Sequence, residues 1–380
     1  MASYEQELGT LTRHFGDIED PRMERTRRHH LLDIITIAIC GVICGADSWV
    51  DIELFGKSKQ AWLAKFLRLP NGIPSHDTFG RVFSRLDPDE FQNSFMEWVA
   101  TISQITKGQV IAIDGKTLRG SHDRANGENA IHIVSAWASA NHVVLGQTKV
   151  DDKSNEIVAI PQLLELLEVS GCIVTIDAMG CQTEIAGQII SKRADYVLAV
   201  KENQGRLYEG VKDSFECARR SGFEDVEHDY YEVVNKGHGR IETRRCWSIS
   251  ADEELDYVDE HKRWPELSSI VMVTSVREVR DEVSVETRYY ISSLEAGARR
   301  LLEATRTHWG IENSVHWILD VAFDEDRSRV RKDHAPQNLA IIRHIALNLL
   351  KQETTSKGGV KARRKLAGWD EDYLITVLAQ

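Results

Sequence analysis

Residues 308–320, HWGIENSVHWILD, carry a side chain able to bind a metal ion at every fourth position. These side chains are His308, Glu312, His316 and Asp320. Residues four apart are neighbours on one face of an α-helix, so a helix here would align all four. Three interpretations follow from this row: a zinc site, a charged stripe on an exposed helix, or one part of a metal site whose other ligands lie elsewhere.

The residues around this row argue against the first two interpretations. The spacing is not the HExxH pattern of zinc proteases, and no cysteine lies in the segment. The tryptophans Trp309 and Trp317 indicate a partly buried helix rather than a free surface helix. The segment therefore favours a site that it shares with other parts of the chain.

Two aspartates elsewhere in the chain have suitable surroundings. Asp114 follows the apolar run VIAI and Asp177 follows IVTI, and the next residue is small in both cases, Gly115 or Ala178. An aspartate in this position often only forms a turn or caps a helix. Neighbouring strands lie about 5 Å apart, however, so two such strand ends in one sheet can share a divalent cation. With Glu312 they would form a three-carboxylate set that suits Mg²⁺ and two-metal phosphoryl transfer.

The elements expected around these residues define an α/β fold class. Five segments are expected in chain order: a helical N-terminal domain in residues 1–106, the first part of the core in 107–205, a β-rich insertion in 206–293, the last part of the core with the catalytic helix in 294–352, and a tail with a loose basic linker in 353–380. The first part of the core reads β-β-β-α-β-α-β, with the two aspartates at the ends of its first and fourth strands.

The helical N-terminal domain contains a candidate for DNA contact. Ser75 or Asp77 is a suitable N-cap for a helix that would present Arg81 and Arg85 one turn apart. A Gly/Pro turn followed by an arginine-bearing helix fits a helix-turn-helix that binds DNA. It fits a plain helical bundle equally well, so both interpretations stand.

The composition is that of an ordinary globular protein. The chain has 380 residues, of which 42% are hydrophobic, which is enough for two or three domains. Its six cysteines form no CxxC pair, which favours reduced thiols in the cytoplasm. The apolar run of residues 34–46 is too short for a membrane span, so we expect a buried helix and no membrane contact.

The charge distribution allows a nucleic-acid partner. The net charge of −12 argues mildly against general nucleic-acid binding. The cations cluster, however, in RMERTRRHH, DRSRVRKDH and KARRK. A basic groove on an acidic protein can still hold a phosphate backbone, although any one patch is as readily a solvated face.

Five motifs, in this order, resemble the DDE transposases of bacterial insertion sequences. They are IAIDGKTLRGS, KSNEIVAIPQLLELL, VTIDAMGCQ, ADYVLAVKENQ and HWGIENSVHWILDVAFDEDRSR. The most similar branch is the ISAs-type group, which includes the H-repeat-associated proteins, and GIPSHDTFGRVFSRLDP resembles the N-terminal domain of that group. The resemblance covers nearly the whole chain.

This resemblance implies a ribonuclease-H-like catalytic core in which Asp114, Asp177 and Glu312 are catalytic and bind Mg²⁺, with Mn²⁺ as a substitute. It implies cleavage at the ends of an insertion sequence and transfer of the freed strand into target DNA. The partner would be double-stranded DNA, bound by a homodimer in the bacterial cytoplasm. The 135 positions from Asp177 to Glu312 would contain the insertion domain of related transposases.

The chain departs from the family pattern around the glutamate. Where related transposases have a tyrosine, an arginine and a lysine, it has Thr305, His308 and Leu319. Contacts with DNA ends would then fall to other residues. The candidates for DNA contact are Arg81, Arg85, Lys116, Arg119, Lys201, His308, His316, Arg327 and Arg329. Rival candidates for the third acid are Asp320, Asp324, Glu325 and Asp326.

Two alternatives to a transposase remain open. A nuclease of the same fold would keep the three acids and cut DNA without joining strands. A transposase-derived DNA-binding protein would bind DNA ends without any chemistry. The complete set of three acids favours an enzyme over the second alternative.

Overall fold

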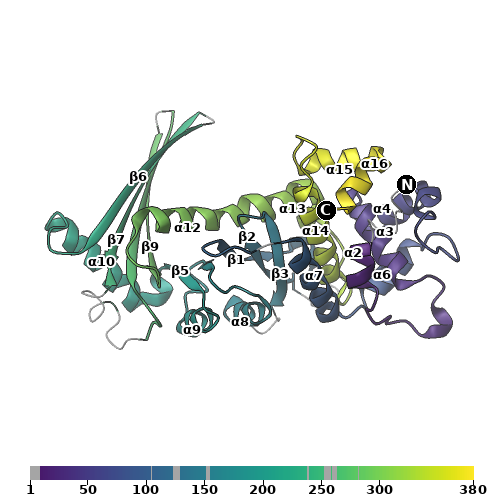
Figure 1. Cartoon of the computed structure of the whole chain (residues 1–380), viewed down its shortest axis with the longest axis horizontal. Coiled ribbons are helices and arrows are strands. Elements are labelled where there is room, and N and C mark those ends of the chain that lie inside the picture. The colour runs from purple at the N-terminus through teal and green to yellow at the C-terminus, as the bar shows by residue number, and fades with distance from the viewer. Residues whose placement is uncertain are drawn as a thin grey trace.

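The computed structural model describes residues 9–380, apart from residues 104, 123–128, 151–154, 238, 252–257, 259–262 and 281. One large sheet runs through the molecule (Figure 1). At one end lies a strand-rich extension, residues 205–292, and at the other a body of helices from residues 9–102 and 335–378. The mixed α/β class expected from the sequence is confirmed. Of the helical domain expected for residues 1–106, residues 1–8 lie outside the described part.

Strands and helices alternate along much of the described chain. The strands are β1 (Val110–Thr117), β2 (His132–Ala138), β3 (Val143–Val150), β4 (Ile173–Ile176), β5 (Asp195–Val200), β6 (His228–Gly237), β7 (Arg240–Ser250), β8 (Ser269–Val279) and β9 (Glu282–Ser292). The α-helices are α2 (Gly9–Phe15), α3 (Leu31–Ile43), α4 (Trp49–Ser58), α5 (Gln60–Leu63), α6 (His76–Phe83), α7 (Pro88–Ile102), α8 (Glu156–Leu166), α9 (Thr183–Ser191), α10 (Gly205–Arg220), α12 (Ala298–Ile311), α13 (Trp317–Phe323), α14 (Ala335–Gln352), α15 (Val360–Trp369) and α16 (Glu371–Leu378).

The described strands pair into a single sheet of nine, in the order β3-β2-β1-β4-β5-β9-β8-β7-β6. β1, β4 and β5 are parallel to one another, whereas β2, β3 and β9 run antiparallel to the strands they pair with. Parallel strands are covered on both faces, which explains why the whole of β4, IVTI, is apolar or buried. The arrangement of the first five strands fits a ribonuclease-H-like core.

The extension continues the core sheet, because β9 pairs with β5. The β-rich insertion expected in residues 206–293 also contains a helix, α10, and a strand, β6, that sequence reasoning missed. In α10, Leu207, Val211 and Phe215 recur at spacing four and are buried, which is a helical pattern. β6 lies at the sheet edge with most side chains exposed, so it lacks the alternation that marks a strand.

The long helix α12 joins the core to the extension. It packs against β1 and β4 of the core and against β6 and β7 of the extension, and α8 and α9 lie on the other side of the sheet (Figure 1). Gly310 allows a close approach, since a Cβ at this position would lie 2.6 Å from the ring of Trp137 on β2. This contact fixes how deeply the helix sits on the sheet, two residues before Glu312.

The C-terminal helices complete the N-terminal helical body. The apolar run of residues 34–46 lies largely in α3, which is buried against α14 and α15. Among the described residues, no helix combines the length and apolar character needed to cross a membrane. The stretch KARRK, expected in a loose linker, lies in α15 instead, because the buried Arg364 side chain donates to the Val42 carbonyl at 3.0 Å.

Replacing Gly310 by alanine should destabilise the protein by about 1–3 kcal/mol. The added methyl group overlaps the buried Trp137 ring, and this clash outweighs the better helix propensity of alanine. Urea unfolding of the full chain measures the effect. Gly205 is the matched control, because it begins α10 and a Cβ there meets no atom within 4 Å. Equal effects of the two substitutions would show that α12 can move off β2 freely.

Candidate active site

The two strand-end aspartates lie side by side. β1 and β4 are parallel neighbours whose register pairs Ile113 with Ile176, so the next residues along the two strands are Asp114 and Asp177. β4 ends there, whereas β1 continues to Thr117 through its pairing with β2. The two aspartates therefore stand where the parallel strands part, which is where α/β sheets commonly bind ligands.

Glu312 comes from a helix whose geometry changes at that residue. α12 ends at Ile311, a π-helical turn, η4, spans Glu312–His316, and α13 begins at Trp317. The Trp317 N–H donates to the Glu312 carbonyl five residues back, as in a π-helix. The wider turn interrupts the regular row expected from the sequence. His308, Glu312 and His316 stay near one another, whereas Asp320 instead pairs with Lys116.

Asp114, Asp177 and Glu312 line a single cavity of about 160 Å³. Three elements that are far apart in the chain thus contribute one carboxylate each. The other charged or polar side chains on the cavity wall are those of Thr175, Lys201, Arg288, Tyr290, Thr305 and His308. Two of the expected DNA contacts, Lys201 and His308, therefore face the same space as the acids.

Within the described part of the chain, Asp114, Glu312 and His316 form a compact group whose ligand atoms all lie within 4.8 Å of one another. His316 Nδ1 is 3.6 Å from Asp114 Oδ2 and 3.6 Å from Glu312 Oε2. Glu312 is 52% exposed, whereas Asp114 is 15% and His316 6% exposed. The group is therefore open to a ligand on the glutamate side and closed behind the histidine.

The protonation of the acids reflects their burial and closeness. Burial raises the pKa of Asp114 to about 7; the His316 ring opposes this shift, and the Glu312 carboxylate adds to it. Interaction with the His316 ring lowers the pKa of Glu312, and burial lowers the pKa of His308, whose Nδ1 lies 3.1 Å from Thr175 Oγ1. Acids that are close together with few counter-charges separate in pKa in this way.

Each aspartate accepts a backbone hydrogen bond through one oxygen, Asp114 within β1 and Asp177 in the turn after β4. The Gly115 N–H donates to Asp114 Oδ1 at 2.9 Å, and the Met179 N–H donates to Asp177 Oδ1 at 3.0 Å. The turn-forming role that the sequence left open is therefore real for Asp177. Since only Oδ1 serves the turn, this role does not exclude a second one as a metal ligand through Oδ2.

Two of the expected DNA contacts are buried against acids of the protein itself. Lys116 Nζ lies 2.6 Å from Asp320 Oδ1 and 2.6 Å from Glu325 Oε2. His316 is buried and faces Asp114 and Glu312. Both side chains are thus engaged by acids of the chain, which argues against a direct contact with DNA at these two positions.

The rival candidates for the third acid lie away from the cavity, and none of the four is among its lining residues. Asp320 and Glu325 are engaged by Lys116. Asp326 is 3.5 Å from the exposed Arg119 side chain, another expected DNA contact. The cavity therefore favours Glu312 as the partner of the two aspartates.

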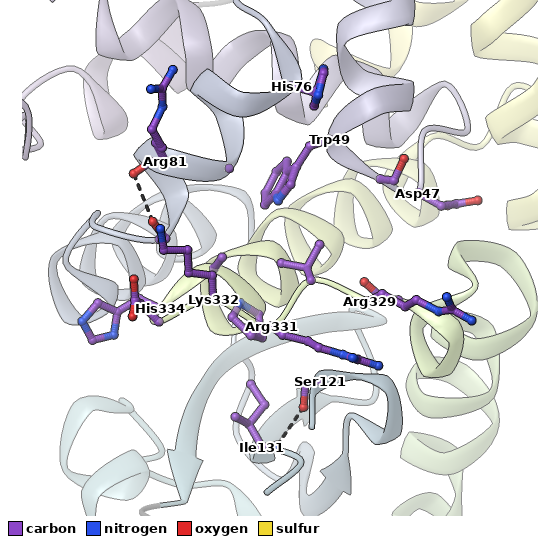
Figure 2. A pocket seen from close by; sticks show the side chains of 18 of the residues that line it. Asp47, Trp49, His76, Arg81, Ser121, Ile131, Arg329, Arg331, Lys332 and His334 are labelled. Atoms are coloured by element: carbon purple, nitrogen blue, oxygen red, sulfur yellow. Dashed lines mark hydrogen bonds between the residues drawn. The ribbon is translucent and has the colours of Figure 1, made fainter. Parts of the chain in front are cut away.

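A larger hollow, which we call the basic groove, lies between the helical body and the core, with a volume of about 1640 Å³. Four of the expected DNA contacts line it: Arg81 and Arg85 from the N-terminal helices, and Arg327 and Arg329 from the segment after α13. Figure 2 shows Arg81 opposite the segment that carries Arg329, with Ser121 of the core nearby. Arg85 lies just beyond the end of α6 rather than on it.

The charges of the basic groove are incompletely paired. Seven lysine or arginine and five aspartate side chains line it, an excess of two positive charges on a chain whose net charge is −12. Four of these cations make no side-chain hydrogen bond or ion pair within the described part of the chain: Arg85, Lys149, Arg329 and Lys332. Such a surface attracts a polyanion.

Sequence reasoning missed Lys149 in the basic groove and Arg288 at the cavity. Lys149 lies on the edge strand β3, and Arg288 lies on β9, which pairs with the distant strand β5. No local pattern marks either residue. Arg331 and Lys332, in contrast, belong to the basic run DRSRVRKDH, which could have been assigned to the same surface as Arg329.

The fold and the site together define a class of protein. Adjacent carboxylates where parallel strands part, faced by a glutamate from a helix, define an α/β protein able to hold a divalent cation at its sheet edge. The basic groove adds the ability to bind a polyanion.

Comparison with known proteins identifies the family. The Transposase DDE domain matches residues 105–349, and the DDE_Tnp_1-associated domain matches residues 12–99. The chain is 42% identical over 375 residues to "Putative transposase YncI" of Escherichia coli O157:H7, covering 98% of this chain and 95% of that protein. It is 40% identical over 377 residues to "H repeat-associated putative transposase YhhI" of Escherichia coli strain K12, covering 98% of each.

The chain therefore belongs to the DDE transposase family, among its H repeat-associated members. This confirms the family expected from the sequence motifs. A weaker likeness, with a TM-score of 0.42 and 13% identity, relates 94% of the chain to 75% of a chain in the piggyBac transposase synaptic complex with hairpin DNA.

Asp114→Asn should stabilise the metal-free protein at high pH. Because the pKa of Asp114 is raised to about 7 in the folded state, the folded protein binds this proton more tightly than the unfolded chain does. The resulting stabilisation is complete below the unfolded pKa and is lost as the pH rises through about 7. Asparagine stays neutral, so the variant should be more stable than the parent by up to about 3–4 kcal/mol near pH 8, and by little near pH 4.

Urea unfolding in the presence of EDTA at the two pH values measures this difference. Asp225→Asn, which changes an exposed acid, is the control and should have the same small effect at both. If the difference in stability between the parent and Asp114→Asn is the same at both pH values, the pKa of Asp114 is not raised in the folded protein.

Proposed function

We propose that the chain is a divalent-metal-dependent DNA transposase with a ribonuclease-H-like catalytic core. It cleaves DNA at the ends of an insertion sequence and joins the freed strand to target DNA. The observation that carries this proposal is the meeting of Asp114, Asp177 and Glu312 at one cavity. Membership of the DDE transposase family supports it.

The donor groups of the cavity fit Mg²⁺ or Mn²⁺. Asp114, Asp177 and Glu312 offer carboxylate oxygens, which are the ligands that these hard cations prefer. Asp114, with its pKa raised to about 7, gives up its proton readily when a positive charge is placed beside it. A cation bound there supplies the positive charge that activates the attacking oxygen and offsets the charge on the phosphate.

The residues of the chain position the reaction rather than take part covalently. The backbone N–H groups of Gly115 and Met179 fix the two aspartates, and Glu312 completes the set from the exposed side. Water attacks the phosphorus at the element end, and the bond to the 3′ oxygen breaks. The freed 3′-hydroxyl then attacks a phosphorus in target DNA. Both steps need alignment and charge neutralisation, so no side-chain nucleophile is required.

Three side chains on the cavity wall are suited to hold the DNA around the bond that is cut. Lys201 is exposed and lines the cavity beside the acids. Arg288 reaches the same wall from the extension. His308, whose pKa is lowered by burial, is neutral at physiological pH and can exchange a hydrogen bond rather than a charge.

The basic groove is proposed to hold the DNA duplex away from the cleaved bond. Arg81 and Arg85 on one wall and Arg327 and Arg329 on the other provide cations for phosphates of both strands. Such contacts give affinity and register without reading the base sequence. Two copies of the chain, each holding one end of the element, would bring both ends together.

The two alternatives differ from this proposal in what they produce. A nuclease of the same fold would release cut ends and no joined product. A DNA-binding descendant would bind ends without cutting them. The three acids at one cavity favour chemistry over binding alone, and strand joining separates transposase from nuclease.

Asn or Gln in place of an acid should abolish the reaction. With labelled DNA carrying the element ends and Mg²⁺ or Mn²⁺, the parent should give cleaved and joined products on gels. Asp114→Asn, Asp177→Asn and Glu312→Gln should each lower the rate by more than about a hundredfold, because each removes a charge at the site of transfer. Glu303→Gln, an exposed change on α12, is the control. Undiminished cleavage by all three variants would rule out this active site.

Arg329→Gln should weaken DNA binding in a salt-dependent way. Loss of one phosphate contact makes the negative slope of log affinity against log salt concentration shallower by about 0.9. Fluorescence anisotropy with a labelled duplex at several salt concentrations measures the slope. Arg220→Gln, an exposed change on α10 outside the groove, should leave it unchanged. If the two variants bind alike, the groove is not the DNA surface.

A further inference from the structure

Lys116 joins the catalytic strand to the catalytic helix. It lies two residues after Asp114 on β1, and alternate residues of a strand point to the same face. Its ammonium lies 2.6 Å from Asp320 Oδ1 on α13 and 2.6 Å from Glu325 Oε2. Glu325 is the first residue of the short helix η5 (Glu325–Arg327). These distances are those of charge-assisted hydrogen bonds.

This ion cluster is buried at Lys116 and Glu325 and partly open at Asp320, which is 34% exposed. Lys116 is 11% exposed and Glu325 is 1% exposed, and Arg343 on α14 lies 3.6 Å from the second oxygen of Glu325. Burial alone would lower the pKa of Lys116, but the two carboxylates raise it, so the ammonium stays charged. A buried pair is costly to break, since the partner left behind keeps its charge without solvation. Lys116 therefore stays with its partners instead of binding a DNA phosphate.

The ion cluster holds the helix at Asp320, on the C-terminal side of Glu312. Asp320 follows Glu312 by eight residues and His316 by four, within one continuous helical stretch. The contact at Gly310 holds the same helix just before Glu312. Between these two fixed points lies the π-helical turn. Contacts outside the cavity thus flank Glu312 on both sides along the helix, and His316 lies 3.6 Å from both Asp114 and Glu312.

We propose that Lys116 is a positioning residue that sets the separation of Asp114 and Glu312 and, through it, the affinity of the cavity for its divalent cation. This inference rests on the proposed function, because it assumes that the cavity binds such a cation. Lys116 itself contacts neither the metal nor DNA. Groups that orient metal ligands from outside typically contribute about 10–100-fold to metal affinity.

The test is Mn²⁺ binding by the full-length protein, measured by isothermal titration calorimetry without DNA. The variants are Lys116→Met, Asp320→Asn and Lys116→Arg. The first two should bind Mn²⁺ about 10–100-fold more weakly than the parent. Lys116→Arg keeps the charge and should recover most of the affinity. Asp320→Asn leaves the Lys116–Glu325 pair in place, so it tests the tie to the helix even if Lys116→Met does not fold.

Lys59 offers a matched control. Lys59 lies between α4 and α5, and its ammonium is 3.1 Å from Glu371 Oε1 at the start of α16, away from the cavity. Lys59→Met therefore removes a long-range ion pair that is exposed to a similar degree as the Lys116–Asp320 pair, and it should leave the Mn²⁺ affinity unchanged. A similar loss of affinity in Lys59→Met would mean that any destabilisation weakens the site, which would overturn the specific role of Lys116.

Two further results would overturn the inference, and they are distinguishable from failure of the proposed function. In the first, Mn²⁺ affinity is unchanged in Lys116→Met and Asp320→Asn although Asp114→Asn abolishes binding; the proposed function would then survive. In the second, Lys116→Met keeps its Mn²⁺ affinity and instead loses DNA affinity with a shallower salt dependence, as for a phosphate ligand. Absence of Mn²⁺ binding by the folded parent would overturn both.

Discussion

Three carboxylates have to stay close together although their charges repel one another. Burial is the main cause of the raised pKa of Asp114, about 7, and the nearby carboxylates of Glu312 and Asp177 add to it. The surrounding structure keeps the acids together by making each acid part of a stiff element. Parallel pairing of β1 and β4 fixes two of the acids, and the backbone N–H groups of Gly115 and Met179 hold them. The third is carried by a helix that is tied to the sheet before and after Glu312, at Gly310 and at Asp320.

Acidic and basic side chains are distributed unevenly along this part of the chain. Lys201 and Arg288 line the cavity with the three acids, whereas the cations of residues 327–332 line the basic groove. The chain from Glu312 to Lys332 serves both sites: it begins at the cavity and ends along the basic groove. Net charge alone, at −12, hides this distribution.

Local patterns in the sequence were sufficient to find the candidate acids. Asp114 and Asp177 follow apolar strand segments, and Glu312 lies in a helix with a recognisable spacing. Positions that depend on contacts between distant segments were not predictable in this way. From the sequence Lys116 was a candidate for DNA contact, and only the fold shows that it lies on β1 and that Asp320 and Glu325 engage it.

The same limit applies to larger elements. The core strands were recognisable from their apolar runs, whereas β6 was missed because an exposed edge strand lacks that signal. The basic groove was not predictable as a site, because its walls come from the N-terminal helices and from the segment after α13. The sequence indicated Arg81 and Arg85 on one wall and Arg327 and Arg329 on the other as candidates for DNA contact. It did not indicate that these two segments lie across one groove.

The extension is connected to the active site by more than the covalent chain. β9 pairs with β5 of the core, and its Arg288 guanidinium lies 4.2 Å from the ring centroid of Trp309 on α12. Trp309 precedes Glu312 by three residues, and both Arg288 and Trp309 line the cavity of the acids. This cation–π contact ties the sheet of the extension to α12, which leads to Glu312. Because both residues of the pair line the cavity, the extension is part of the wall that surrounds the acids.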